Sequence, residues 1–139
     1  MNRQTITNLN FILILLFVTL GSCSKKQNIA HQLKGSWNVD EYELEEYVDG
    51  ELKNNEVRYN EGTLTFSEDG TGTSSGFNFV SGQTSFTWSN TSATLTITAG
   101  GSTIEYDIIE NSNTSFIFRL TTIVNTNEKD IETWTLSPN

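Results

Sequence analysis

The sequence predicts an all-β domain, an up-and-down antiparallel meander of about eight strands closed into a small barrel. From residue 33 onward, apolar and polar side chains alternate with a period of two. Residues 71–104 form a stretch of 34 residues without Asp, Glu, Lys or Arg that is rich in Thr, Ser and Gly, a composition typical of strands and tight turns. Short turns favour a meander over an immunoglobulin-like sandwich. The expected strands, mostly under nine residues, disfavour an outer-membrane barrel.

Length and charge narrow the function classes. A chain of 139 residues buries one sizeable core. Its formal charge of −9 disfavours nucleic acid as a partner. With one Cys and one His, the chain has neither an internal disulfide nor a standard His/Cys zinc site. No nucleophile–base pair stands out, so we expect no enzyme activity, no metal and no cofactor.

The first 22 residues predict an export signal. Arg3 lies in a polar start, and residues 11–20 (FILILLFVTL) form an uncharged apolar run that ends in Gly21 and Ser22. Ten apolar residues are too few to cross a bilayer as a helix. The length and the flanks are typical of a secretory signal peptide over 1–22.

The end of this signal, Leu20-Gly21-Ser22-Cys23, resembles the lipobox of bacterial lipoproteins. The resemblance implies that Cys23 is lipidated, that the signal is cut before it and that residues 23–33 form a lipidated tether to the bilayer. Ser24 stands where an Asp would imply retention at the inner membrane, so the resemblance points to the outer membrane. Lys25 and Lys26 occupy the place of the acidic run that precedes surface display in some lineages. Periplasmic and surface orientations both stay open.

The domain is expected to span 34–139 and to begin with a bulged strand. Trp37 and Val39 share one face of this strand, whereas Tyr42 and Leu44 share the same face only if one residue is skipped. This change of parity predicts a β-bulge near Asp40. The acidic run that follows, residues 40–51, is expected to be a solvated face, with calcium binding as the weaker alternative.

The remaining strands follow from alternating runs between turn residues. We expect a strand through residues 63–67, a turn at 68–72 and a strand carrying Phe77 and Phe79. Gly100-Gly101 predicts a hairpin. Further runs lie at 86–89, 94–98, 104–108, 116–120 and 131–136.

The Gly35-Ser36-Trp37 start, the meander and Trp134 in the last run make residues 34–139 similar to a lipocalin-like (calycin-type) barrel domain. The resemblance implies that Trp37 plugs the closed end and that the barrel binds a small hydrophobic ligand. We expect a monomeric lipoprotein that carries such a ligand in the cell envelope. The alternative is a filled barrel that contacts an envelope protein or glycan through its outer surface. The candidate ligand-lining residues are the aromatic side chains of the alternating runs: Phe66, Phe77, Phe79, Phe86, Trp88, Tyr106, Phe116 and Phe118.

Overall fold

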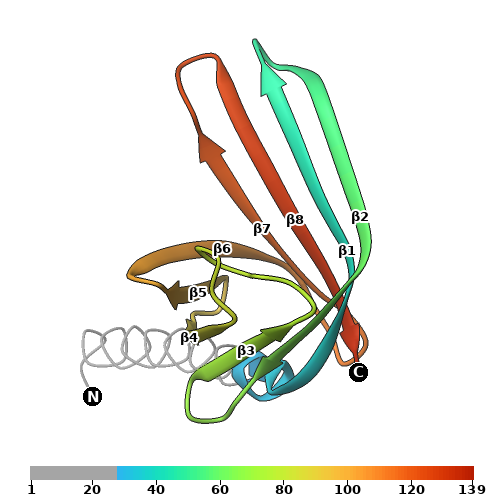
Figure 1. Ribbon diagram of the computed structural model, residues 1–139, viewed down its shortest axis with the longest axis vertical. Helices are drawn as coiled ribbons and strands as arrows, with labels where there is room; N and C mark the ends of the chain where they lie inside the picture. The colour runs from blue at the N-terminus through green and yellow to red at the C-terminus, as the bar shows by residue number, and fades with distance from the viewer. Residues whose placement is uncertain (1–27) are drawn as a thin grey trace, which may run out of the picture.

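Each strand pairs with its neighbour in sequence, and the first pairs with the last, so the sheet closes on itself (Figure 1). The computed structural model describes residues 28–139, and within them eight antiparallel strands confirm the predicted meander and barrel. The signal segment 1–22 and Cys23 lie outside the described residues. The strands are β1 (Gly35–Val48), β2 (Glu51–Phe66), β3 (Thr71–Ser75), β4 (Ser85–Asn90), β5 (Thr94–Ala99), β6 (Ser102–Asn111), β7 (Phe116–Ile123) and β8 (Glu128–Pro138).

The predicted bulge at Asp40 is confirmed. The register of β1 shifts between Val39 and Glu41 against both of its neighbours, β2 and β8. The Asp40 carboxylate accepts a hydrogen bond of 3.0 Å from the Ser137 hydroxyl. As a result Val39 before the bulge and Tyr42 after it are both buried, since the extra residue restores the inward face.

Four strands are much longer than the sequence predicts. β1 and β2 run for 14 and 16 residues, and together with β7 and β8 they project past β3 to β6 (Figure 1). We call this projection, residues 41–59 and 120–132, the wing. Its strand order is β2-β1-β8-β7, and its two tips are joined by a hydrogen bond from the Asp49 N–H to the Asn127 carbonyl at 2.7 Å. The wing is rich in charged side chains, so its strands lack the apolar alternation that predicted the others.

The opposite end of the barrel is closed by a short helix at 28–33 (Figure 1). The sequence assigns these residues to the tether, but Ile29 and Leu33 are almost completely buried in the core. The Trp37 indole N–H donates to the Leu33 carbonyl at 2.8 Å, so the helix and the first strand are fixed to each other. Among residues 28–139, no helix is long and apolar enough to cross a membrane.

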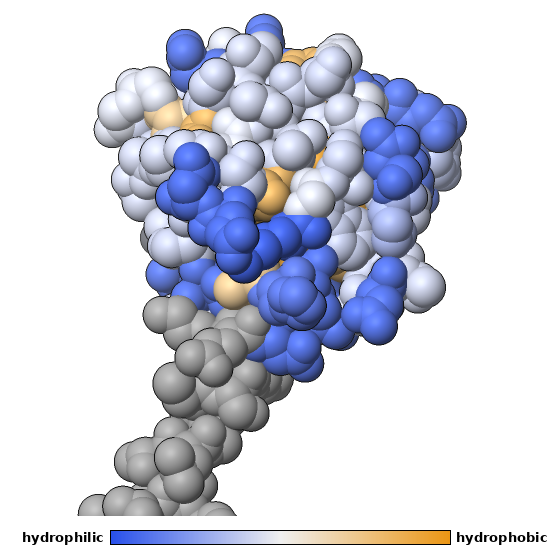
Figure 2. Space-filling model, turned by 90° about the horizontal axis from the view of Figure 1, so that it is seen from below, coloured by the Kyte–Doolittle hydropathy of each residue, from blue (hydrophilic) through white to orange (hydrophobic). Residues whose placement is uncertain are grey.

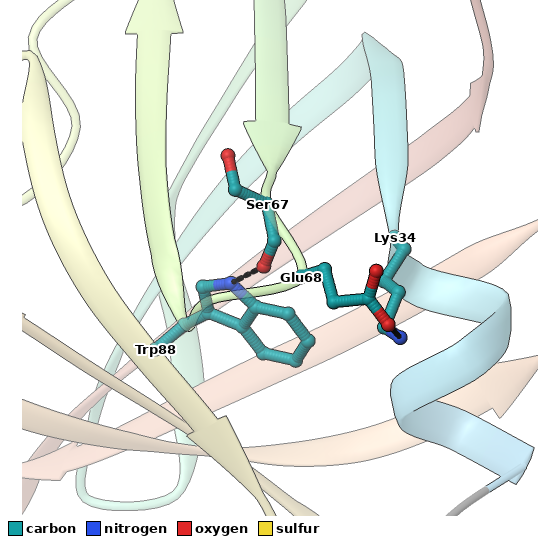
Figure 3. Close-up of polar contacts among 4 residues, drawn as sticks. All are labelled: Lys34, Ser67, Glu68 and Trp88. Carbon is teal, nitrogen blue, oxygen red and sulfur yellow. Dashed lines mark hydrogen bonds and ion pairs between the residues drawn. The ribbon is translucent and has the colours of Figure 1, made fainter.

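Trp88 also belongs to this closed end (Figure 3). Its indole N–H is shared between the carbonyls of Ser67 at 3.1 Å and Thr71 at 3.0 Å, which fixes the β2–β3 turn against β4. Beside it, Lys34 pairs with Glu68 at 2.6 Å. This ion pair is solvent-exposed and adds little to stability.

The prediction of a strand through Phe77 and Phe79 is wrong. The strand is β3, at Thr71–Ser75, and both phenylalanines lie in the loop 76–84 between β3 and β4. β3 carries no large apolar side chain, because a Cβ at Gly72 would lie 2.2 Å from the Phe86 ring. Such a strand shows no apolar alternation. The predicted hairpin at Gly100-Gly101 is confirmed, with φ of 58° and 83° at these residues.

Trp37→Ala should be among the most destabilising single changes. It removes a ring that is 3% exposed and packs 6.1 Å from the Phe116 ring. Losing a buried Trp costs about 3–5 kcal/mol, a large part of the about 5–15 kcal/mol that holds a domain folded. Urea unfolding of a soluble form comprising residues 24–139 measures the effect.

The control is Glu43→Ala in the wing, which loses one exposed hydrogen bond from Asn55. Its free energy of unfolding should change by less than about 0.5 kcal/mol. An unchanged midpoint for Trp37→Ala would show that Trp37 does not close the barrel.

Candidate functional site

Most of the predicted ligand-lining residues fill the barrel instead of lining a cavity. The side chains of Phe66, Phe116 and Phe118 are at most 1% exposed, and Tyr106 is 2% exposed. An eight-stranded barrel is just wide enough to be filled by its own side chains. The deep interior of this barrel is therefore a packed core.

Phe79, from the loop 76–84, completes this packing. Its ring centroid lies 5.5 Å from that of Phe86 and 6.2 Å from those of Tyr106 and Phe118. The loop folds over the barrel and places its own ring where a ligand would enter. Backbone hydrogen bonds from Phe79 to Gln83 and from Gln83 to Val80 hold it there.

A cleft of about 260 Å³ remains above this loop, at the base of the wing. We call it the mouth cleft. Two of the eight predicted residues line it, Phe77 and Phe79, whereas Trp88 lies at the closed end and the others are in the core. The full lining consists of Tyr42, Arg58, Glu61, Phe77, Asn78, Phe79, Glu132 and Trp134.

The floor of the mouth cleft is aromatic and centres on Trp134. The Trp134 ring stacks on Phe77 with centroids 5.6 Å apart, and it lies 4.5 Å from Tyr42 and 5.1 Å from Phe79. Strand register places Tyr42, Trp134 and Phe118 side by side on the inward face. Trp134 is 7% exposed, and its indole N–H has no hydrogen-bond partner among the described residues. A buried donor without a partner is uncommon and calls for an explanation.

Arg58 is the basic residue among those that line the cleft, and it forms ion pairs with residues of its own strand. Its Nε lies 2.7 Å from Glu56 and its Nη1 lies 3.7 Å from Glu61. Its guanidinium carbon also lies 5.0 Å above the centre of the Tyr42 ring. The Arg58 charge is thus shared between two carboxylates and an aromatic face.

Glu132 lies in a different environment. On β8 it is flanked by Leu44 of β1 and Leu120 of β7. Burial, reinforced by the charge of Asp130, raises the pKa of the Glu132 carboxyl above its usual value. The Trp134 indole approaches this carboxylate and offsets part of the rise without reaching hydrogen-bond geometry. Within residues 28–139, no Lys or Arg lies within ion-pair distance of Glu132.

The Tyr42 hydroxyl is neutral at physiological pH. Burial, followed by the nearby Glu132 charge, raises the pKa of Tyr42 to about 12, against the opposing effect of Arg58. The mouth cleft therefore offers an apolar floor, a neutral hydroxyl in Tyr42 and a carboxylate in Glu132, with the buried Trp134 N–H beneath its floor.

Residues 33–118 match the family model described as the lipocalin-like domain. The chain belongs to this family. A search of curated proteins gave no match. The matched residues of the lipocalin-like domain run from the end of the 28–33 helix into β7 and include Tyr42, Arg58 and Phe77.

Sequence reasoning missed six residues of the mouth cleft in this lipocalin-like domain, one in the loop 76–84 and five on strands. For the residues on strands, the sequence signal is the alternation of inward and outward positions. Once a bulge is placed at Asp40, Tyr42 and its partners across the sheet face inward. The same alternation along β8 places Glu132 on the face that carries Trp134. The acidic run gives no metal centre, because residues 28–139 bring together no group of three His, Cys, Asp or Glu side chains that could hold an ion. The missed residues are Tyr42, Arg58, Glu61, Asn78, Glu132 and Trp134.

Glu132→Gln should raise the stability of the lipocalin-like domain at neutral pH. The pKa of the Glu132 carboxyl is higher in the folded protein than the 4.5 of the unfolded chain. Its contribution to stability is therefore complete only at a pH below 4.5, and it is lost as the pH rises through the folded-state pKa. Gln stays neutral throughout. The thermal midpoint of the variant should exceed that of the parent at about pH 7, and the gap should close at about pH 4.

The control is Glu105→Gln on β6, where the side chain is exposed and the midpoint should hardly change at either pH. A Glu132→Gln protein that melts below the parent at neutral pH would show that the Glu132 charge is stabilised within the fold.

Proposed function

We propose that this chain is a membrane-anchored lipocalin-like lipoprotein that binds a small hydrophobic ligand in the mouth cleft. The observation that carries the proposal is Trp134, a ring at the floor of an open cleft whose buried indole N–H has no hydrogen-bond partner among the described residues. Ligand pockets are mostly apolar and hold a few polar groups that fix orientation. Membership of the lipocalin-like family supports the same class of ligand.

The mouth cleft, and not the barrel interior, is the proposed site because the interior is packed. Phe66, Phe116 and Phe118 are almost completely buried beneath the loop, and Phe79 packs on Phe118 and Trp134 from above. A ligand of the size of one or two rings fits a volume of about 260 Å³ without opening the core.

Phe77→Ala should weaken ligand binding. The change removes the ring that stacks on Trp134, and such aromatic contacts are worth about 0.5–1.5 kcal/mol, so affinity should fall up to about tenfold. Titration of the full chain with the neutral apolar dye N-phenyl-1-naphthylamine, followed by fluorescence, measures the dissociation constant.

Ile109→Ala, at an exposed position of β6, is the matched control and should bind the dye like the parent. Equal affinities for the parent and for Phe77→Ala would place the binding site elsewhere.

The alternative function is that of a filled barrel whose outer surface contacts an envelope protein or glycan. The packed interior favours it, and so do Tyr59 and Val57, which are 63% and 37% exposed on the wing. Their register opposite Glu41 and Glu43 places them on the outer face. Native mass spectrometry of the protein purified from its own envelope separates the two functions, because a bound small molecule adds a defined mass.

The anchoring part of the proposal rests on the sequence at Cys23. Four residues separate Cys23 from the helix at 28–33, a reach of at most about 18 Å. A lipid on Cys23 would therefore hold the closed end near the bilayer. The wing projects away from the closed end (Figure 1), and the mouth cleft lies at the base of the wing. The surface seen from the closed end is mostly hydrophilic, with only small apolar areas (Figure 2). This surface favours attachment through the lipid over insertion of the domain. The proposed location is the outer membrane, because Ser24 and not Asp follows Cys23, and the proposed form is a monomer.

Cys23→Ser should abolish both lipidation and signal cleavage by the lipoprotein peptidase, because the thiol is the nucleophile that accepts the lipid. The parent should incorporate labelled palmitate and run at the mature mass. The Cys23→Ser variant should remain unlabelled at the precursor mass. Labelled palmitate on the Cys23→Ser variant would contradict the anchoring proposal.

A further inference from the structure

The mouth cleft carries negative charge that its own residues leave without a counter-ion. Arg58 is bound by Glu56 and Glu61. Glu132 and its neighbour Asp130 remain, and their charges repel each other enough to raise the pKa of Glu132 further. Glu132 lines the cleft, so a molecule in the cleft can reach its carboxylate.

The surroundings of Glu132 select what kind of cation can pair with it. Leu44 and Leu120 flank it across the sheet, and the Trp134 and Tyr42 rings lie next along the same strands. A small inorganic ion keeps its water shell and gains little from leucines and indole. An ammonium group attached to an apolar body gains from the carboxylate, from the aromatic faces and from the apolar flanks together.

The unpartnered Trp134 N–H points to the same conclusion. It approaches the Glu132 carboxylate without forming a hydrogen bond. A carboxylate has two oxygens and about four acceptor positions, so it can accept from the indole N–H and from an ammonium at the same time. An ammonium would neutralise the charge that burial destabilises, and one Glu132 oxygen could then settle on the indole donor.

We propose that the mouth cleft is selective for an organic cation, a molecule with a small apolar body and one ammonium group. The body lies on the floor formed by Trp134 and Phe77, and the ammonium pairs with Glu132. This inference rests on the proposed function, to which it adds the charge of the ligand.

Three probes with the same body and different charge test the inference: 4-phenylbutylammonium, 4-phenylbutanol and 4-phenylbutyrate. Each is titrated calorimetrically into the full chain held in phosphatidylcholine nanodiscs at neutral pH and low salt, with empty nanodiscs as the blank. We expect the ammonium to bind at least about tenfold more tightly than the alcohol, and the carboxylate to bind most weakly. The ammonium should also shift the Trp134 indole N–H signal in NMR spectra, assigned by its loss in Trp134→Phe.

Glu132→Gln is the decisive variant. It should reduce the advantage of the ammonium over the alcohol to within about twofold, while the alcohol still binds. Retained binding of the alcohol excludes misfolding as the cause. Glu105→Gln, an exposed carboxylate on the outside of β6, should keep the full preference.

The outcomes separate this inference from the proposed function. Equal binding of all three probes, or a preference that survives Glu132→Gln, overturns the selectivity for cations and leaves a cleft for apolar ligands. Tightest binding of 4-phenylbutyrate would show that the cleft prefers an anion and would overturn the proposed preference for a cation. Absence of binding by every probe, with an unshifted Trp134 signal, overturns both the inference and the proposed site.

Discussion

One extra residue in β1, Asp40, decides which side chains of the long hairpins face inward. Before it, the inward positions are Trp37 and Val39, and after it they are Tyr42 and Leu44. Without the bulge, strict alternation would turn Glu41 and the acids that follow it toward the aromatic core, and Tyr42 toward water. The packing of Tyr42 on Trp134, and with it the floor of the mouth cleft, depends on this single irregularity.

The loop 76–84 separates the packed core of the barrel from the mouth cleft above it. Its positive φ values at Gly76, Ser81 and Gly82 turn the chain back over the barrel, and Phe79 then completes the core. Because this loop closes the core, the mouth cleft lies above the loop, at the base of the wing. There the Phe77 ring contacts Phe79, which belongs to the core packing. It also stacks on Trp134 and lines the cleft.

The barrel could be predicted from the sequence because most of its strands and turns are marked by patterns of neighbouring residues. Alternation marks the runs, Gly100-Gly101 marks a hairpin, and the parity change marks the bulge at Asp40. β3 and the wing give weaker signals for different reasons. β3 has Gly72 where other strands carry an inward side chain, and the charged wing strands do not alternate between apolar and polar residues. Of the site, the aromatic residues Phe77 and Phe79 could be named from composition. Glu132 and Arg58 could not, because their surroundings also depend on residues across the sheet: Leu44 and Leu120 beside Glu132, and Tyr42 beside Arg58.

The two ends of the barrel thus differ in how fully their buried polar groups are hydrogen-bonded. At the closed end, Ile29 and Leu33 are buried, and Trp37 and Trp88 satisfy their indole donors on backbone carbonyls. At the mouth, the third tryptophan, Trp134, has no hydrogen-bond partner for its indole N–H within residues 28–139, and Glu132 keeps a carboxylate among leucines at a cost in folding free energy. The same indole chemistry is satisfied at one end and unsatisfied at the other. A well-packed closed end can offset the cost of an uncompensated carboxylate and a buried donor at the mouth, where Glu132 lines the cleft and the Trp134 N–H lies beneath its surface.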